Sequence, residues 1–283
     1  MDNQEIARVL DEVADLLAWS GANPFRVRAY RQAAGTIRQL ERPAAEILAS
    51  EGTAGLERLE HIGPGLAAAI RSLVETGSLR LLDELRAEAT PEEVLRGLPG
   101  VGPELAERMV AALGLSTVAE LEAALVEGRL AEVPGVDPRL AAAMRDELER
   151  RLGRPLEAPG AERPPVEELL DVDREYREKA AASQLFTIAP KRFNPKKEAW
   201  LPVLHTRRGP RRYTALFSNT KLAHDLGKTH DWVVLYYRRP GEREGQATVV
   251  TETEGELAGR RVVRGRERET REAYARMREP ARA

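Results

Sequence analysis

There is no cysteine in this sequence of 283 residues, which excludes disulfide bridges and zinc sites built from thiolates. Histidine is also scarce, and its four copies do not show the spacing of a metal-ligand motif such as HxxxH. No apolar run approaches the roughly 20 residues that a membrane-spanning helix needs. The first residues, MDNQEIARVL, are acidic and amphipathic, unlike a secretory signal. We therefore expect a soluble cytoplasmic protein without a membrane partner.

Charge is unevenly distributed along the chain, although the formal net charge is only −2. Residues 183–283 contain 22 Lys and Arg against 12 Asp and Glu, a net charge of +10, and the remaining residues carry −12. A basic part of this kind suits a nucleic acid or another polyanion as partner. Alternatively, the asymmetry reflects electrostatic attraction between the two parts of the chain. The acidic part could also bind a protein partner.

Apolar periodicity predicts helices through the first half of the chain. Residues 1–20 place their aliphatic side chains on one helical face, and Asp2 with Glu5 resembles a capping box. A second helix, over 25–40, is expected to bury one apolar face and to expose a face rich in arginine. The apolar face consists of Phe25, Tyr30, Ala33, Ala34 and Ile37, and the exposed face of Arg26, Arg28, Arg31 and Arg38.

Three similar segments, 56–79, 95–113 and 130–144, recur about every 37 residues. The middle one, LRGLPGVGPELAER from residue 95, reads as a short helix, a Gly100-Val101-Gly102 turn and a second helix that begins at Pro103. This pattern is typical of a helix-hairpin-helix element. Its glycines permit positive φ, and amides at a helix start can hold a nucleic-acid phosphate without reading a base. A purely structural helix connection is the alternative.

The two flanking segments depart from this pattern. The first reads His61-Ile62-Gly63, so a histidine replaces the first glycine. His61 either donates to a phosphate when protonated or is a polar loop residue. The third reads Gly135-Val136-Asp137, and the Asp137 carboxylate should repel a phosphate. We expect the third hairpin to be structural.

The second half of the chain changes character. Residues 153–166 are rich in proline and glycine and are interpreted as a linker, followed by a charged helix over about 166–182. Short β-type runs then alternate with turn residues, with one helix near 219–228 and another over 266–279. The run DWVVLYYRR is apolar on both faces, which predicts a central strand in a sheet of roughly five or six.

The fold class predicted from these patterns is multi-domain, with an all-α helix-hairpin-helix N-terminal domain and a smaller α+β C-terminal domain. The expected boundaries are 1–152 for the helical region, 153–182 for the linker and charged helix, and 183–283 for the basic α+β domain.

Three segments together resemble the N-terminal region of family X (polymerase-beta-like) DNA polymerases. They are NPFRVRAYRQAA (23–34), the 56–79 segment with Glu75-Thr76-Gly77, and LPGVGPELAERM (98–109), and the resemblance covers about residues 1–150. It implies an all-helical fold that binds gapped or nicked DNA, with the hairpins on the backbone and the small N-terminal domain on a 5′ phosphate. It also implies a setting in DNA repair.

Two departures limit what the resemblance implies. Family members with lyase activity form a Schiff base through a lysine, and the matching position here is Ala69, which has no amine. The sequence motifs of the polymerase palm are absent. Asp171-Val172-Asp173 has the spacing of a metal-binding pair, but it lies in a charged helical run, where the dipole favours acids near the helix start. We therefore expect neither polymerase nor lyase activity.

DNA contact is predicted for the hairpins, for the arginines around them and for the arginine run near the C-terminus. A solvated strand edge that prevents aggregation is the alternative for that run. Aromatic residues among the basic residues of the second half suit single-stranded nucleic acid or fill the core, the role favoured for Trp232. The predicted DNA-binding residues are Gly100, Val101, Gly102, Arg96, Arg108, Ile62, Gly63, Gly65, Arg26, Arg28, Arg31, Arg261, Arg264 and Arg266.

An enzymatic C-terminal domain is the alternative function. A metal-dependent nuclease needs converging carboxylates, and Asp231, Glu252 and Glu254 are candidates. A metal-free phosphodiesterase that uses His205, His224 or His230 is a further alternative. Glu252 and Glu254 share one face of a strand, but the lysine common in restriction-type nucleases is missing. No organic cofactor is expected, and the alternative is a bound divalent or monovalent cation. A protein-binding scaffold is a third interpretation.

Overall fold

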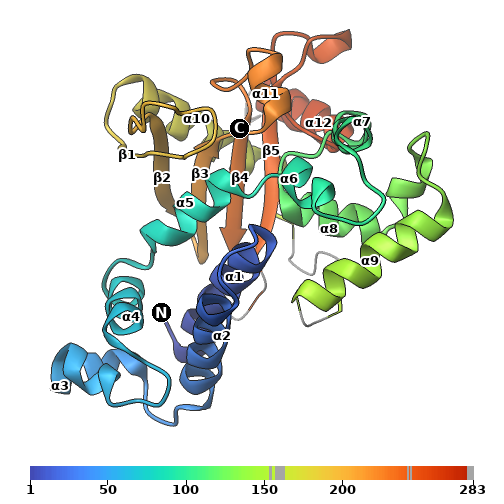
Figure 1. Cartoon of the computed structure of the whole chain (residues 1–283). Coiled ribbons are helices and arrows are strands. Elements are labelled where there is room, and N and C mark those ends of the chain that lie inside the picture. Colours follow the sequence, from blue (N-terminus) through green and yellow to red (C-terminus); the bar gives the residue numbers. More distant parts are fainter. Residues whose placement is uncertain (153–154, 157–162, 241, 243, 279–283) are drawn as a thin grey trace. The chain divides into compact units, whose positions relative to one another are not determined.

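The computed structural model describes residues 1–152, 155–156, 163–240, 242 and 244–278, so most of the predicted linker lies outside it (Figure 1). The chain divides into two compact units. Unit 1 comprises Met1–Ala89 and Met144–Pro155, and unit 2 comprises Thr90–Ala143 and Leu156–Ala283. The second and third hairpins therefore group with the C-terminal sheet, whereas the prediction placed them in one domain with the N-terminal helices.

Unit 1 is helical, as its sequence periodicity predicted. The capping box at the start of α1 is confirmed, because the Asp2 carboxylate accepts from the Glu5 amide while the Glu5 carboxylate accepts from the Asp2 amide. The core of the unit joins the apolar faces of its helices. Its elements are α1 (Asn3–Trp19), α2 (Pro24–Gln39), α3 (Ala44–Glu57), α4 (Pro64–Thr76), α5 (Arg80–Glu88) and the end of α9 (Pro138–Leu152).

The prediction of burial is wrong for one apolar residue of α2, Phe25. Phe25 leaves 77% of its surface exposed, whereas Ala33, Ala34 and Ile37 are buried. On a period of 3.6 residues, Phe25 lies roughly 120° from the centre of the face that those three residues form. An apolar side chain in the first helical turn thus remains at the surface beside Arg26.

Unit 2 combines the hairpin segment with an antiparallel sheet. The described strands form a six-stranded meander in the order β1 to β6, which confirms the predicted α+β class. The hairpin segment contains α6 (Pro91–Arg96), α7 (Pro103–Leu113), α8 (Val118–Val126), η1 (Arg129–Glu132) and the start of α9. The sheet contains β1 (Phe186–Ile188), β2 (Leu201–Arg208), β3 (Arg211–Phe217), β4 (Val233–Arg238), β5 (Gly245–Thr251) and β6 (Arg261–Val263). The other elements are α10 (Val166–Ala181), α11 (Lys221–Asp225), η2 (Gly255–Leu257) and α12 (Glu267–Arg278).

The prediction of a central strand is confirmed for β4, which pairs with β3 on one side and β5 on the other. Val233, Val234 and Leu235 are all buried, so both faces of this strand are covered. Trp232, which precedes the strand, is buried as expected.

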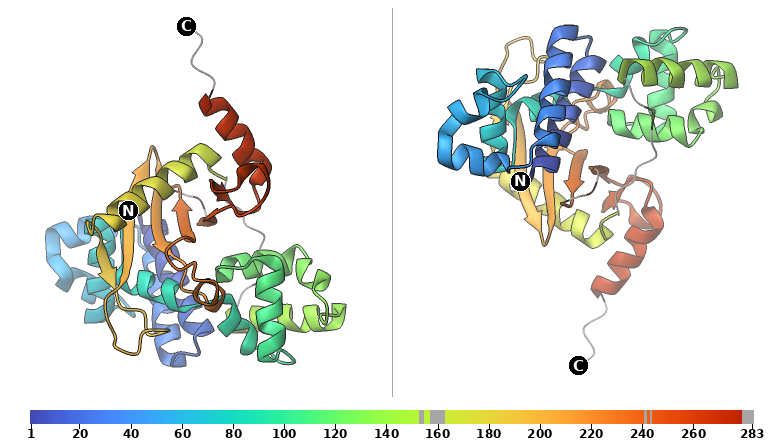
Figure 2. Two further views of the ribbon diagram at one scale, coloured as in Figure 1. Left: turned by 90° about the horizontal axis from the view of Figure 1, so that it is seen from above. Right: turned by 90° about the horizontal axis from the view of Figure 1, so that it is seen from below.

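Helix α10 lies across one face of the sheet (Figure 2). Polar contacts hold it there. The Tyr176 hydroxyl donates to the Pro202 carbonyl and accepts from the Phe217 amide. The Glu168 carboxylate accepts from Tyr213 and pairs with Arg211. Burial, and then the contact with Glu168, raise the pKa of the Tyr213 hydroxyl, so it stays a neutral donor.

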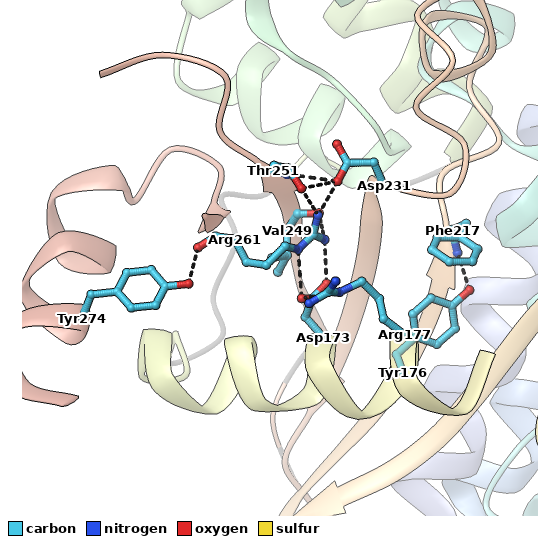
Figure 3. Close-up of polar contacts among 9 residues, drawn as sticks. All are labelled: Asp173, Tyr176, Arg177, Phe217, Asp231, Val249, Thr251, Arg261 and Tyr274. Atoms are coloured by element: carbon cyan, nitrogen blue, oxygen red, sulfur yellow. Dashed lines mark hydrogen bonds and ion pairs between the residues drawn. The ribbon is translucent and has the colours of Figure 1, made fainter. Parts of the chain in front are cut away.

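A buried ion-pair cluster connects α10 to the far edge of the sheet (Figure 3). Asp173 on α10 is fully buried. Arg261 on β6 donates to both of its carboxylate oxygens, at 3.0 and 2.7 Å, and Arg177 donates to it at 3.1 Å. Arg261 also donates to the Asp231 carboxylate at 2.5 Å, and this carboxylate accepts a hydrogen bond from the Thr251 hydroxyl.

The carboxylates of Asp171 and Asp173 therefore form ion pairs with arginines of the same unit. Asp171 pairs with Arg174 and Arg208, and Asp173 pairs with the two arginines described above. The helix dipole favours acids in the first turn of a helix. Asp171 and Asp173 both lie beyond the first turn of α10. The sequence-based explanation through the helix start is wrong, and long-range pairing with the sheet replaces it.

Side chains of Thr248 and Arg264 join the sheet to the hairpin segment within unit 2. The Thr248 hydroxyl donates to Glu120 on α8 at 2.9 Å. Arg264 donates to the Gly114 carbonyl at 2.8 Å and the Ser116 hydroxyl at 2.9 Å, with its guanidinium 4.3 Å from the centroid of the Trp232 ring.

Within the described part of the chain, no single helix has the length and apolar composition to cross a membrane. Helices α7 and α8 satisfy both criteria only when taken together, and they are bent by 83° at the break between them.

Asp173→Ala is expected to lower the free energy of unfolding of unit 2 by about 3–5 kcal/mol, because it leaves the buried Arg261 guanidinium without its main partner. Chemical denaturation followed by tryptophan fluorescence measures this loss, since Trp200 and Trp232 report on unit 2. Asp171→Ala is the matched control. Its carboxylate is 38% exposed, so its loss should cost about 1 kcal/mol or less. Equal losses for the two variants would contradict the role of the buried cluster.

Candidate nucleic-acid interface

The described residues contain the three predicted hairpins, and these share one backbone geometry. The first residue of each turn is left-handed, with φ of 63° at His61, 78° at Gly100 and 94° at Gly135. Glycine adopts this conformation at little cost, whereas a histidine in it is strained. The histidine of the first hairpin thus replaces a glycine without changing the turn.

The middle residue of each turn is an internal anchor. Its side chain is buried, and its amide donates to the carbonyl three residues earlier at 3.0 to 3.2 Å. Two of the predicted DNA-binding residues, Ile62 and Val101, therefore shape the turn from inside the protein. The anchors and their acceptors are Ile62 with Leu59, Val101 with Leu98, and Val136 with Val133.

The helix starts that follow the first two turns present backbone amides. Helix α4 begins after Gly63 and α7 after Gly102, and neither start has a side-chain cap. The first amides of a helix have no acceptor within it. In α4 these include Gly65 and Leu66, and water or an anion can satisfy them. Leu66 is absent from the predicted set, although the rule for helix starts identifies it.

The two open helix starts differ in charge. Helix α7 carries Glu104 in its first turn, whereas the first turn of α4 carries no charged residue. A carboxylate beside the amides competes with a phosphate for the same positive end of the helix. The sequence pattern favours the second hairpin for its two glycines. The structure shows that the first hairpin has the less acidic helix start.

The third hairpin supplies its own anion. The Asp137 carboxylate accepts from the Leu140 amide at 2.7 Å, which is the position of a helix N-cap. This internal carboxylate occupies the place where a phosphate would bind, in agreement with the expected structural role of the third hairpin.

The predicted arginines near the hairpins have different surroundings. Arg26 and Arg28 at the start of α2 are exposed, and within the described residues no ion-pair partner is found for either. Arg31 pairs with Asp15 at 3.4 Å. Arg96 donates to Glu107 at 3.0 Å. Arg108 is exposed, with its guanidinium nitrogen 3.7 Å from the position of a Cβ on Gly135, so it lies beside the third hairpin.

The C-terminal arginines are used inside unit 2. Arg261 is held by Asp173 and Asp231, as described above. Arg264 donates to the hairpin segment. Arg266 donates to the Pro164 carbonyl at 2.7 Å and pairs with Glu269, and its side chain is only 12% exposed. We therefore assign these three arginines to the fold instead of to DNA, and they do not form a solvated strand edge either.

The nuclease candidates do not converge on a metal site. Asp231 is paired with Arg261. Glu252 accepts from the amides of Thr253 and Glu254, which forms a local turn. His205 lies on β2 beside the Thr214 hydroxyl, at 3.1 Å. No group of three or more His, Asp or Glu side chains among the described residues could hold a metal ion.

Comparison with known proteins agrees with the hairpin geometry. Residues 1–79 match the helix-hairpin-helix domain family, and residues 53–114 and 92–150 each match the SAM-like helix-hairpin-helix tandem family. Over 180 residues, or 63% of this chain, the sequence is 27% identical to the DNA polymerase/3′-5′ exonuclease PolX of Bacillus subtilis (strain 168). The matched part spans 29% of that relative's length. These matches support DNA binding and a relationship of the helical part to family X DNA polymerases.

His61→Gly is expected to stabilise unit 1 by up to about 1 kcal/mol, because relief of the backbone strain at this left-handed position outweighs the conformational entropy that an added glycine brings to the unfolded chain.

Gly100→Ala tests the same geometry in the opposite direction. Its φ is 78°, and the new Cβ would lie 3.1 Å from Leu140 Cδ1, so a loss of about 1–2 kcal/mol is expected. Denaturant unfolding measures both, and destabilisation by His61→Gly would contradict the strain argument.

Proposed function

We propose that this chain binds the DNA backbone without sequence preference through its first two hairpins. The expected targets are gapped, nicked or otherwise damaged DNA, and the expected setting is DNA repair. The observation that carries the proposal is the pair of uncapped helix starts behind Gly63 and Gly102. Each follows a turn that is anchored from inside and so presents its amides in a fixed geometry.

The chemistry of these helix starts suits phosphate. Backbone amides make the same contact with any nucleotide, so they position a protein on DNA and carry no base preference. The exposed Arg26 and Arg28 add positive charge in unit 1. The helical part is acidic overall, so the contact must act at short range. Binding should weaken as salt rises, because phosphate contacts release counterions.

The proposal does not include polymerase or lyase activity. Ala69 is buried in α4 and offers no amine for a Schiff base. The motifs of a polymerase palm are absent from the sequence. The activities in the name of PolX belong to a protein of which this chain matches 29%. A primer-extension assay on gapped DNA is expected to show no nucleotide incorporation, and incorporation would contradict this part of the proposal.

The third hairpin suggests a direct test of the first two. A Cβ added to Gly63 or Gly102 would meet no heavy atom within 4 Å, and both glycines have negative φ, so each accepts a side chain without strain. The double variant Gly63→Asp with Gly102→Asp copies the self-capped geometry of Asp137. Because a fixed carboxylate then occupies each anion position, affinity for DNA should fall about tenfold or more, a loss of at least roughly 1.4 kcal/mol.

The matched control is Gly63→Asn with Gly102→Asn, which caps both helices without adding charge. Both double variants should keep or raise the thermal stability. Fluorescence anisotropy with a gapped duplex, a nicked duplex and an intact duplex compares them with the unmodified chain. Equal affinity of the Asp and Asn variants would exclude the helix starts as the phosphate contact. Absence of binding by the unmodified chain at low salt would overturn the proposed function.

A further inference from the structure

The two faces of the C-terminal sheet differ in how their arginines are neutralised. On the face that α10 covers, carboxylates of that helix meet each arginine. Arg208 donates to Asp171 at 2.8 Å and to Glu175 at 2.7 Å. Arg211 lies 3.3 Å from Glu168. This face carries its basic residues in internal ion pairs.

On the opposite face, three arginines form a row, and among the described residues none of the three has an ion-pair partner. Arg207 on β2 is the direct cross-strand partner of Arg212 on β3, and Arg212 is the partner of Arg238 on β4. Direct partners have Cβ atoms only about 5 Å apart, and like charges at this distance destabilise a sheet. Among the described strand residues of this face, from β1 to β5, none is acidic. We call Arg207, Arg212 and Arg238 the arginine row.

The surroundings of the arginine row fit an external anion. Arg207 is exposed and Arg212 is half-buried. Arg238 is buried, and within the described residues its Nε has no hydrogen-bond partner. A row of adjacent guanidinium groups is suited to successive phosphates, because each can donate bidentately to one phosphate.

Aromatic side chains lie next to the arginine row on the same face. A second row lies two residues from the arginine row on each strand. In it, His205 is the cross-strand partner of Thr214, and Thr214 is the partner of Tyr236. Phe186 on the edge strand stacks on His205, with ring centroids 5.6 Å apart and planes inclined by 22°. His205 is exposed, and Phe186 leaves 45% of its surface exposed. In the next row, Val203, Leu216 and Val234 are buried, and Phe186, the cross-strand partner of Val203, is the exposed residue at its edge.

We propose that this face binds single-stranded DNA, with phosphates on the arginine row and bases stacked on Phe186, His205 and Tyr236. The two rows are roughly 7 Å apart, since each strand residue advances the chain by about 3.3 Å. A nucleotide whose phosphate contacts the arginine row can therefore extend its base over the aromatic side chains. Unpaired bases expose their ring faces for such stacking, and arginine with aromatic residues is the usual composition of such surfaces.

Single-stranded DNA fits this surface better than duplex DNA. In a duplex the ring faces of the bases stack on one another, and an aromatic residue cannot reach them without unstacking. This surface differs from the hairpins in its chemistry, since it uses arginines and aromatic rings instead of helix amides. It would add to the proposed function a contact for an unpaired strand.

The charge contribution is tested with Arg207→Glu combined with Arg212→Glu. The matched control is Arg268→Glu with Arg271→Glu on α12, where both side chains are well exposed. Both variants change the net charge equally. With fluorescent oligo-dT as the probe, the first variant should bind about tenfold or more weakly at low salt, and the control should bind nearly as the unmodified chain. Thermal melting verifies that each variant is folded.

The stacking contribution is tested with Phe186→Ala. Phe193→Ala is its control, because the two rings are exposed to nearly the same extent, 45% and 46%. Phe186→Ala should weaken oligo-dT binding about fivefold or more, while Phe193→Ala should not. The difference should vanish with an abasic oligonucleotide of the same length, which keeps the phosphates and lacks the bases.

The proposal is overturned if the arginine variant binds oligo-dT like its charge-matched control, or if the two phenylalanine variants bind it alike. It is also overturned if affinity falls only in proportion to the unfolded fraction. Its failure is distinguishable from that of the hairpin proposal, because Gly63→Asp with Gly102→Asp should weaken binding to gapped duplex more than binding to oligo-dT, whereas Arg207→Glu with Arg212→Glu should weaken oligo-dT binding more.

Discussion

The ion pair between Asp173 and Arg261 sets the arrangement of the C-terminal sheet. Asp173 is fully buried on α10, and Arg261 lies on the last strand, so the pair joins elements that are 88 residues apart. A buried carboxylate without a partner would be costly, and the two groups must therefore meet in the folded chain. This requirement positions α10 over one face of the sheet, where its other carboxylates, Glu168 and Glu175, meet arginines in turn.

This arrangement changes the meaning of the charge asymmetry. The net charge of +10 over residues 183–283 omits the acidic residues of α10, which precede residue 183. Those acids neutralise Arg208, Arg211 and Arg261 on the covered side. Attraction between an acidic segment and the basic domain, one of the two alternatives for the asymmetry, therefore accounts for part of it. Arg207, Arg212 and Arg238 are strand arginines that α10 does not reach, and they lie on the opposite face of the sheet.

Local patterns in the sequence predicted the elements, whereas long-range contacts decided the site. Helical periodicity, the capping box and the three hairpin turns depend on residues a few positions apart, and the structure reproduces them. The roles of Arg261 and Arg264 depend on partners that the fold brings from far along the chain, and no local pattern contains that information. Phe25 shows the limit within one helix: hydrophobicity suggested burial, but the phase of the helix places it at the surface.

One backbone position distinguishes the three hairpins, which share the same turn geometry. It is the N-cap of the second helix, occupied by Gly63, Gly102 and Asp137 in turn. A glycine there leaves the helix amides to an external acceptor, whereas an aspartate satisfies one of them internally and adds a negative charge. The turn before the cap stays the same in each case, because its buried anchor and left-handed first residue hold it. The turn and the state of the helix start are therefore separable properties, and a single side chain determines whether the first amides of the helix are left open or are capped within the protein.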